Sequence, residues 1–279
     1  MRRFGTILRL RMVWIALSLM LFVQGCGMEQ LTAEQSLNRA IAGLEGVDRL
    51  TFKGEMAIRN GESGVFEQSV AFEGELKNHH LLTLTTSKSA SPVSSSSVYS
   101  AGNTSMDGLK GTMKYEGGIW RPLADGYSND NWMSPLNPLE QLQMIGKSNK
   151  KVTEESGAAR GTKVLRIELD SKASRQMITE ALNGQMQQLR NRMDQKGDAL
   201  YPENEKSRKR LLAVWEKGNR ELNQLLSKAD VSTVFYLTIN KKTDLPQKLS
   251  SERKVSYQDS FGRKHTESMM SNISFSQSR

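Results

Sequence analysis

The feature that most constrains this fold is a strict alternation of apolar and polar residues shortly after the start of the chain. In the segment LTFKGEMAI (residues 50–58), apolar side chains fall on one side of an extended chain, while Lys53 and Glu55 fall on the other. After the turn NGESG, the next segment repeats the pattern. The alternation predicts an antiparallel β-meander with one dry face. Its members are Leu50, Phe52, Met56, Ile58, Phe66, Val70, Phe72 and Leu76.

Further strands and two short helices are predicted along the chain. Thr32 and Gln35 have capping-box spacing before a helix over 31–44 that carries Leu37, Ile41 and Leu44. Asn137 and Pro138 predict the start of a short helix over 137–142. Strand-like segments are residues 80–86, 97–101, 104–115, 118–123, 162–169, 231–240, 249–257 and 266–276.

Residues 171–229 break the β rhythm and predict two long amphipathic helices, either as an α-hairpin or lying against the sheet. Ser171 is the expected cap of the first helix, and a connector around residues 197–202 precedes the second. Between Lys172 and Lys228 there are 12 basic and 7 acidic residues, so this segment is positive. The apolar positions are Ile178, Leu182, Met186, Leu189, Met193, Leu211, Trp215, Leu222, Leu225 and Leu226.

The first 26 residues have the layout of a secretory signal. Residues 1–11 carry four arginines and no acid, and residues 12–23 form an apolar run. The run is shorter than the roughly 20 residues that span a bilayer, so a retained transmembrane anchor is the second choice. Cys26, the only cysteine, follows this run after two intervening residues, so no disulfide is expected.

Val23-Gln24-Gly25-Cys26 resembles the lipobox of bacterial lipoproteins, although Gln24 stands where that family usually has a small residue. The resemblance implies a signal peptide over 1–25, lipid attachment (diacylglyceryl and acyl chains such as palmitate) at Cys26, and a mature domain over 26–279. It also implies a lipid-anchored protein on the extracytoplasmic face of the cell membrane, with the membrane as a partner. Two acyl chains hold a protein on a membrane where one does not.

The sequence of elements resembles the LolA/LolB-like half-barrel superfamily: a lipidated N-terminus, one amphipathic helix, a meander, an inserted helical stretch and the closing run YLTINKKTDLP (residues 236–246). The resemblance implies an α+β fold in which a curved antiparallel β-sheet, a half-barrel, wraps around helices. It implies one half-barrel domain over 26–279, with an inserted helical hairpin at about 171–229. It further implies an apolar cleft that takes acyl chains, and no catalytic motif.

No pattern in the sequence indicates catalysis, a cofactor or a metal. His79 and His80 are adjacent on an expected strand, so they point to opposite faces and cannot hold one metal together. There is no second cysteine, nucleophile elbow, phosphate-binding loop or dinucleotide fingerprint. The sequence favours a non-enzymatic binding protein, with a hydrolase as a distant alternative.

The sharpest basic cluster is KSRKR, residues 206–210. Lys206, Arg208, Lys209 and Arg210 are candidates for contact with an anionic membrane surface rather than with nucleic acid. The alternative is an ordinary solvated helix face with i,i+4 ion pairs. Two functions stay open: an envelope protein that binds an apolar or acylated ligand, such as a lipid or lipoprotein carrier, and an interaction or regulatory lipoprotein that docks an envelope protein through its basic helical arm.

Overall fold

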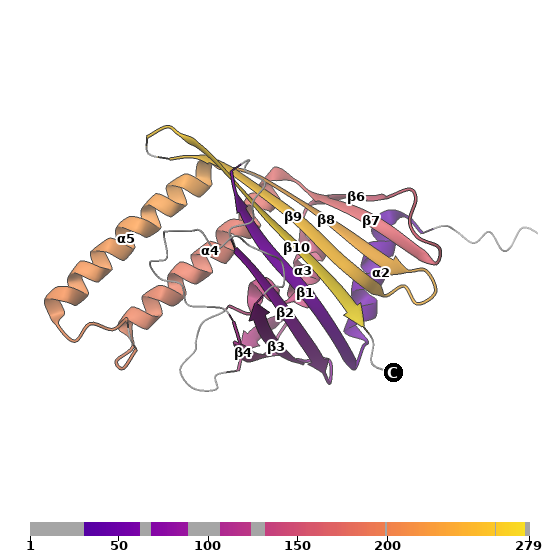
Figure 1. Cartoon of the computed structure of the whole chain (residues 1–279), viewed down its shortest axis with the longest axis horizontal. Helices are drawn as coiled ribbons and strands as arrows, with labels where there is room; N and C mark the ends of the chain where they lie inside the picture. Colours follow the sequence, from indigo (N-terminus) through magenta and orange to yellow (C-terminus); the bar gives the residue numbers. More distant parts are fainter. Residues whose placement is uncertain are drawn as a thin grey trace, which may run out of the picture. The chain divides into compact units, whose positions relative to one another are not determined.

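One antiparallel sheet organises the chain (Figure 1). The computed structural model describes residues 31–61, 68–88, 107–123, 132–198, 200–259 and 261–276. The predictions for the signal peptide, Cys26, Phe66 and a strand at 97–101 lie outside these residues. Residues from Ala33 onward form one compact unit, which holds every element described below.

The sheet contains ten described strands in the order β5-β4-β3-β2-β1-β10-β9-β8-β7-β6. Every neighbouring pair is antiparallel, and β10 pairs with β1 at the centre. The strands are β1 (Arg49–Asn60), β2 (Gln68–Lys77), β3 (Leu81–Lys88), β4 (Lys110–Glu116), β5 (Ile119–Pro122), β6 (Lys150–Glu154), β7 (Thr162–Leu169), β8 (Asp230–Asn240), β9 (Pro246–Gln258) and β10 (Lys264–Ser276).

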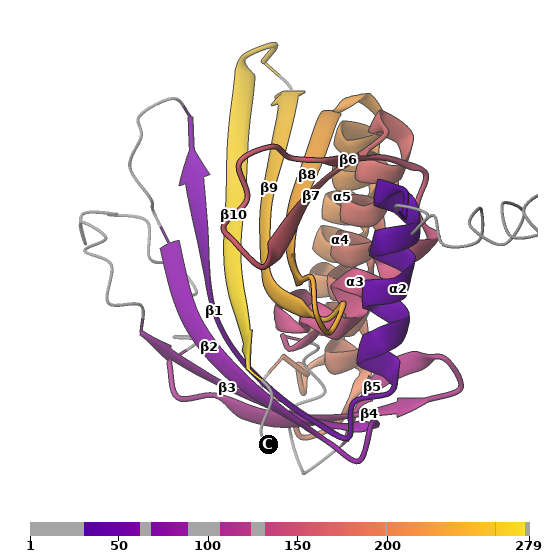
Figure 2. The ribbon, with the colours of Figure 1, turned by 90° about the vertical axis from the view of Figure 1, so that its right-hand side faces the viewer.

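The helices lie on the inner side of the curved sheet (Figure 2). They are α2 (Ala33–Glu45), α3 (Pro138–Lys147), α4 (Ser171–Asp194) and α5 (Glu205–Lys228), with a short 3-10 helix η1 (Ser134–Leu136) before α3. The predicted α+β class, with a curved antiparallel sheet wrapped on helices, is confirmed, and so is the helical hairpin, which lies between β7 and β8. No helix in the described part of the chain combines the length and apolar character needed to cross a bilayer.

The caps show where local sequence determines the helix ends. Asn137 caps α3 as predicted, because its Oδ1 accepts hydrogen bonds from the N–H groups of Leu139 and Glu140. The cap of α4 is Asp170 and not Ser171, since Asp170 Oδ1 accepts the Ala173 N–H at 2.6 Å. That hydrogen bond is the main reason why the pKa of Asp170 lies below its usual value.

The centre of the inner face is packed around two phenylalanines and two glycines on β1 and β2. Phe52 lies opposite Gly74, and Gly54 lies opposite Phe72. The two rings meet edge to face with centroids 6.5 Å apart. A Cβ on either glycine would overlap the facing ring, so each glycine makes room for an aromatic side chain.

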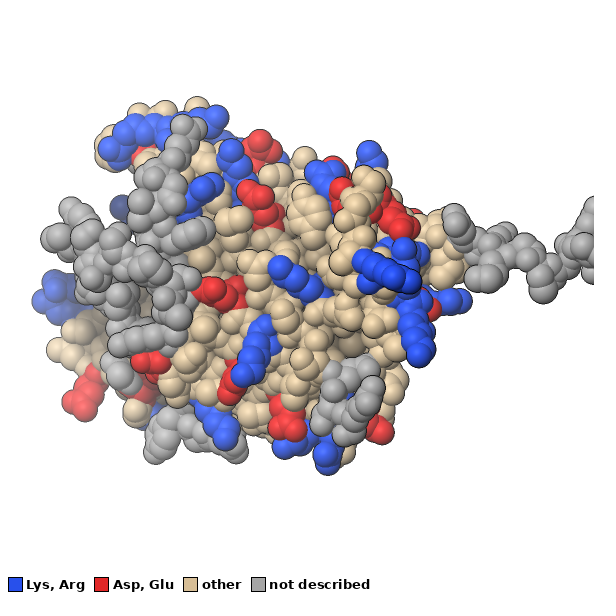
Figure 3. All heavy atoms as spheres, turned by 45° about the vertical axis from the view of Figure 1, so that its right-hand side comes forward, with Lys and Arg blue, Asp and Glu red and all other residues tan. Residues whose placement is uncertain are grey.

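The outer face of the sheet is polar. Lys53 pairs with Glu73 at 3.5 Å, and Lys77 pairs with Glu75 at 2.9 Å. Figure 3, which takes in this side of the molecule, shows basic and acidic side chains interspersed over the surface. The alternation that predicted the strands thus separates a dry inner face from a charged outer one.

Candidate functional site: a pocket at the edge of the half-barrel

Most of the inner face is filled core. α2 buries Leu37, Ala40 and Leu44 against the sheet, and α3 buries residues of the same kind. Phe52 and Phe72 are nearly inaccessible. Val70 and Met56 are partly buried and pack against this core, and neither lines the pockets described below. The predicted apolar cleft therefore does not lie over the middle of β1 and β2.

An apolar pocket of about 250 Å³ opens instead where α2 and α3 meet the β2–β5 end of the sheet. Its walls are aliphatic and aromatic, with a few polar groups among them. Such a mixture is typical of sites that bind small molecules. The lining residues are Ile41, Leu44, Glu45, Leu76, His79, His80, Tyr115, Trp120, Leu139, Leu142 and Gln143.

The β4–β5 hairpin positions the aromatic wall of this pocket. Its two turn residues, Gly117 and Gly118, have φ of 62° and 85°, which a two-residue turn of this hand requires and which glycine adopts at low cost. The turn places Trp120 directly opposite Tyr115, with ring centroids 5.2 Å apart. Trp120 Nε1 is buried and has no hydrogen-bond partner in the described part of the chain. The indole N–H is thus available to an acceptor group.

Histidines 79 and 80 lie at the same pocket, in the turn between β2 and β3. They were expected on a strand, but Asn78 and His79 have φ of 52° and 61°, so the chain turns there. His79 Nε2 pairs with Asp48, and His80 Nδ1 meets the carbonyl of Asn78. His80 is thus held within its own turn, whereas His79 is held by Asp48, the residue before β1. No group of three His, Cys, Asp or Glu residues able to hold a metal occurs within the described ranges.

A second hollow, the α3–α4 groove, adjoins the pocket. It measures about 580 Å³ and shares Trp120 and Gln143 with the pocket. Its walls come from the β4–β5 hairpin, α3 and the first turns of α4, including Met177. Glu140 also lines it; burial raises the pKa of this carboxyl group, against the opposing effect of a 2.8 Å hydrogen bond from Ser134 Oγ. The two hollows are thus neighbours with two walls in common, and together they are the candidate binding region.

The predicted basic cluster lies on the first turns of α5, and none of its residues lines the pocket or the groove. Arg208 donates to Asp194 at 3.0 Å and lies over the Tyr201 ring, and the first of these contacts raises its pKa. Lys209 pairs with Glu205, four residues earlier, at 3.7 Å. Lys206 and Arg210 are exposed and make no ion pair with other described residues. The cluster is thus half paired and half free.

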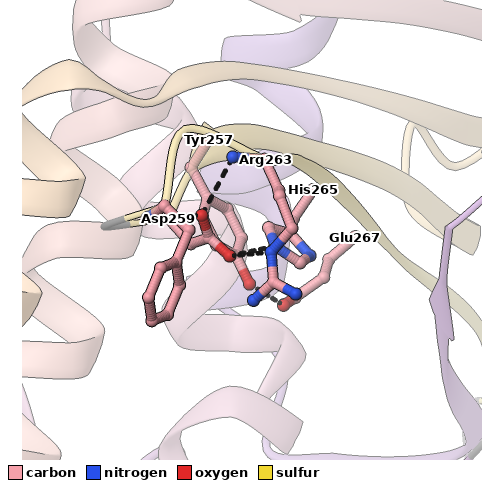
Figure 4. Close-up of polar contacts among 6 residues, drawn as sticks. Tyr257, Asp259, Arg263, His265 and Glu267 are labelled. Atoms are coloured by element: carbon pink, nitrogen blue, oxygen red, sulfur yellow. Dashed lines mark hydrogen bonds and ion pairs between the residues drawn. The ribbon is translucent and has the colours of Figure 1, made fainter.

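A second polar cluster lies at the tip of the β9–β10 hairpin (Figure 4). Asp259 accepts the backbone N–H groups of Phe261 and Arg263, and its Oδ2 meets Arg263 Nε at 2.7 Å and His265 Nε2 at 3.1 Å. Desolvation acts to raise the pKa of Asp259, but these hydrogen bonds outweigh it and hold the pKa well below its usual range. The Asp259 carboxylate therefore stabilises the β9–β10 turn.

Tyr257 belongs to the same cluster. Its hydroxyl donates to Glu267 Oε1 at 2.7 Å, and its ring stacks on His265. Desolvation, followed by the bond to Glu267, raises the pKa of Tyr257 to about 12. The hydroxyl thus stays protonated and keeps donating its hydrogen bond to the Glu267 carboxylate.

Sequence reasoning missed the pocket because its walls come from four separate parts of the chain. Two local signals point to it: the Gly117-Gly118 turn, which sets Tyr115 opposite Trp120, and the capped helix that begins after Asn137. Neither signal shows by itself that the two elements leave a space between them.

No family model matches this sequence, and no curated protein matches it either. Two solved structures are similar in outline. A LolA superfamily protein from Nitrosomonas europaea is 10% identical over 88% of this chain and 92% of its own, with a TM-score of 0.26. A lipovitellin structure concerned with lipid–protein interactions is 7% identical over 84% of this chain and 26% of its own, with a TM-score of 0.30. Because both TM-scores are below 0.5, neither carries an argument on function.

Proposed function

We propose that this protein is a membrane-anchored extracytoplasmic lipoprotein that binds an apolar or acylated ligand, without catalysis. The apolar pocket beside Trp120 carries this proposal, since the rest of the inner face is packed. Ligand sites usually measure about 300–1,000 Å³. The pocket of about 250 Å³ suits a short apolar chain, and the adjoining groove of about 580 Å³ leaves room for a longer chain or a headgroup.

The test is to block the pocket without disturbing the core. Ile41 lines the pocket and is only partly buried, so Ile41→Trp should fill the space. Residues 27–279 retain the whole compact unit and suit a binding assay with a fluorescent fatty acid. Ile41→Trp should lower uptake at least tenfold. Val214→Trp, on an exposed arm position, is the matched control and should leave uptake unchanged.

Native mass spectrometry gives an independent readout. The purified 27–279 fragment should carry an added lipid mass that Ile41→Trp loses. If the parent fragment neither takes up the fluorescent fatty acid nor carries any lipid mass, the carrier proposal is wrong.

The proposed anchor is Cys26. Replacing it by serine should abolish acylation and leave either uncleaved precursor at the membrane or protein shed into the medium. Normal processing and unchanged membrane retention of Cys26→Ser would mean that residues 12–23 anchor the chain instead.

We further propose that the basic cluster of α5 makes weak contact with anionic lipid. Lys206 and Arg210 should dominate, because Arg208 and Lys209 already have acidic partners. Binding to anionic vesicles should fade as salt rises, since exposed charges are screened over about 10 Å at 0.1 M. Lys206→Gln/Arg210→Gln should remove most of it. The measurement is flotation of the protein with the vesicles. If the variant floats as well as the parent, the cluster is an ordinary solvated helix face.

A second candidate function is docking of an envelope protein through the helical arm, α4 and α5. The supporting observation is apolar exposure: Val214 is 68% exposed and Leu189 is 40% exposed. A photo-crosslinker at position 214 should then capture one defined partner in intact cells, whereas one at Lys53 on the outer face should not. Equal labelling at the two positions would remove this candidate.

A further inference from the structure

Arg253 is a positive charge on the inner face of the sheet, near the β9–β10 hairpin. On β9 it lies opposite Thr233 of β8 and Met269 of β10, in a row that continues to Ile58 of β1. Side chains that lie directly opposite one another on antiparallel strands share a face and are neighbours. α4 covers this row, and Arg253 Nη2 contacts Met177 Sδ at 2.7 Å. The guanidinium is thus held between the sheet and α4.

No acidic side chain in the described ranges neutralises this guanidinium. Arg253 makes no ion pair with the described residues, and its Nε is enclosed without a hydrogen-bond partner. Glu267, in the next row of the inner face, is engaged by the Tyr257 hydroxyl. Glu252 precedes Arg253 on β9 and is exposed, and adjacent strand residues point to opposite faces. Burial alone lowers the pKa of Arg253 to about 10, which still leaves it charged at neutral pH.

Two buried hydroxyl groups near Arg253 also lack partners. Thr233 Oγ1 is on the residue directly opposite, and Ser174 Oγ is one helical turn before Met177 on the same side of α4. Their residues are 1% and 0% exposed. A buried polar group without a hydrogen bond is costly, and such groups are uncommon. A cation on a partly buried side chain, with buried hydroxyl groups on the neighbouring strand and on the covering helix, matches the hydrogen-bonding needs of an oxygen anion.

Met177 connects this donor set to the candidate binding region. It lines the α3–α4 groove on one side and contacts Arg253 on the other. Methionine is unbranched and changes rotamer readily. Because Met177 both contacts the guanidinium and lines the groove, a change of its rotamer is the route by which a headgroup in the groove would reach Arg253.

We propose that Arg253, Thr233 and Ser174 bind the anionic headgroup, a carboxylate or a phosphate, of an amphiphile whose acyl chain occupies the adjoining groove and pocket. This inference rests on the proposed function and narrows its ligand class to acidic lipids. A neutral lipid leaves the buried charge unpaired, and a cationic one is repelled by it.

The test compares ligands that share a chain and differ in the headgroup. Oleate, oleyl phosphate and oleyl alcohol each compete with a fluorescent fatty acid for residues 27–279. The parent should bind both anionic ligands at least tenfold more tightly than the alcohol. Arg253→Met should abolish this preference and leave binding of the alcohol unchanged, while Arg253→Lys should retain part of it. Lys254→Met, on the adjacent exposed position of β9, is the matched control and should preserve it.

Thermal melts separate a binding role from a structural one. Removing an uncompensated buried charge is often neutral or stabilising, so Arg253→Met should melt at or above the parent temperature. Oleate should raise the melting temperature of the parent and not that of Arg253→Met, because only a ligand that binds the native state stabilises it. Thr233→Val keeps the shape of the side chain but removes its hydroxyl group. This variant should bind oleate severalfold more weakly than the parent.

The outcomes are distinguishable from failure of the proposed function. If none of the oleyl ligands binds the parent, the pocket proposal fails and this inference fails with it. If the alcohol binds as tightly as oleate, the pocket stands and the headgroup assignment is wrong. If inorganic phosphate alone binds and oleyl phosphate does not compete with it, the donor set serves a free anion, which also overturns the assignment.

Discussion

The two pairs of helices in this protein differ sharply in how they are held. α2 and α3 are 13 and 10 residues long, and each buries four residues. α4 and α5 are both 24 residues long, yet they bury three residues and one residue. Helices in proteins are stabilised mainly by burying an apolar face and only secondarily by their length. The short helices are therefore parts of the core, and the long ones form an arm that packs against the sheet mainly through the first turns of α4.

The arm is held together by local contacts between its own helices. Trp215 Nε1 donates to the carbonyl of Met186 at 2.9 Å, and Arg190 lies over the Trp215 ring. Around these contacts are exposed i,i+4 ion pairs such as Lys217–Glu221, which contribute only about 0.3–0.5 kcal/mol each. Regions with few buried apolar contacts open first. We expect the arm to exchange its amide protons well before the sheet does.

The largest test of this contrast is Gly74→Val on β2. The new side chain would overlap the ring of Phe52, which is almost fully buried and cannot move aside. Overpacking of this kind costs about 1–3 kcal/mol, and displacement of the ring puts the loss at the upper end. The change is measured as the free energy of unfolding in urea. A stability loss below 0.5 kcal/mol would mean that the body is as loosely packed as the arm.

Trp215→Leu tests the arm. Loss of the hydrogen bond to Met186 and of the contact with Arg190 should cost about 1–2 kcal/mol locally. Amide exchange should speed up in α4 and α5 and stay unchanged in β1 and β10. Faster exchange across the whole sheet would show that arm and body unfold together.

A smaller effect of opposite sign is expected for Gly184→Ala in α4. A Cβ there meets no atom within 4 Å, in contrast to Gly74. Alanine is a better helix former than glycine by about 0.8–1.0 kcal/mol, so protection of the α4 amides should rise. Gly218→Ala in α5 is open in the same way and should behave alike. Destabilisation by either change would show that the arm packs against something at these positions.

The smallest effect concerns Glu140 on α3, where burial raises the carboxyl pKa. A raised pKa in the folded state means that the native protein holds the proton more tightly than the unfolded chain. That contribution is present below the unfolded pKa, about 4.5, and is lost as the pH rises through the folded pKa. Glu140→Gln should therefore match the stability of the parent in acid and slightly exceed it near neutral pH.

Stability measured between pH 4 and pH 8 provides the check. A variant that lost stability at neutral pH and not in acid would mean that the ionised carboxylate stabilises α3. Gln143→Glu, one turn further along the same helix, is the reverse control, because it adds a carboxyl group to α3 instead of removing one.

The parts of the fold that the sequence predicted are those set by neighbouring residues. The alternation around Phe52 and Phe72 defined β1 and β2, and Asn137 with Pro138 defined the start of α3. β6 escaped prediction because its five residues, KKVTE, form an edge strand with no alternating apolar pattern. Asp170, and not Ser171, caps α4 because the Asp170 carboxylate accepts the Ala173 N–H from one position earlier in the chain.

The candidate site could not be predicted because it depends on elements far apart in the chain. Arg253 lies in SSERKVSY, which looks like a solvated strand; its burial comes from α4, whose Met177 is 76 residues away. Trp120 forms a pocket wall only because the end of α2 and the first turns of α3 lie beside it. Both facts are consequences of helix placement, which apolar periodicity does not encode.

The pairing of β1 with β10 bears on how the protein is made. Thr51 lies beside Ser276, so the middle of the sheet joins the first described strand to the last one. Until β10 emerges, β1 and β9 are unpaired edges of two separate half-sheets, and exposed strand edges invite association between chains. Contacts over such a separation also slow folding. The nascent chain therefore has to be kept apart from its copies until β10 has emerged.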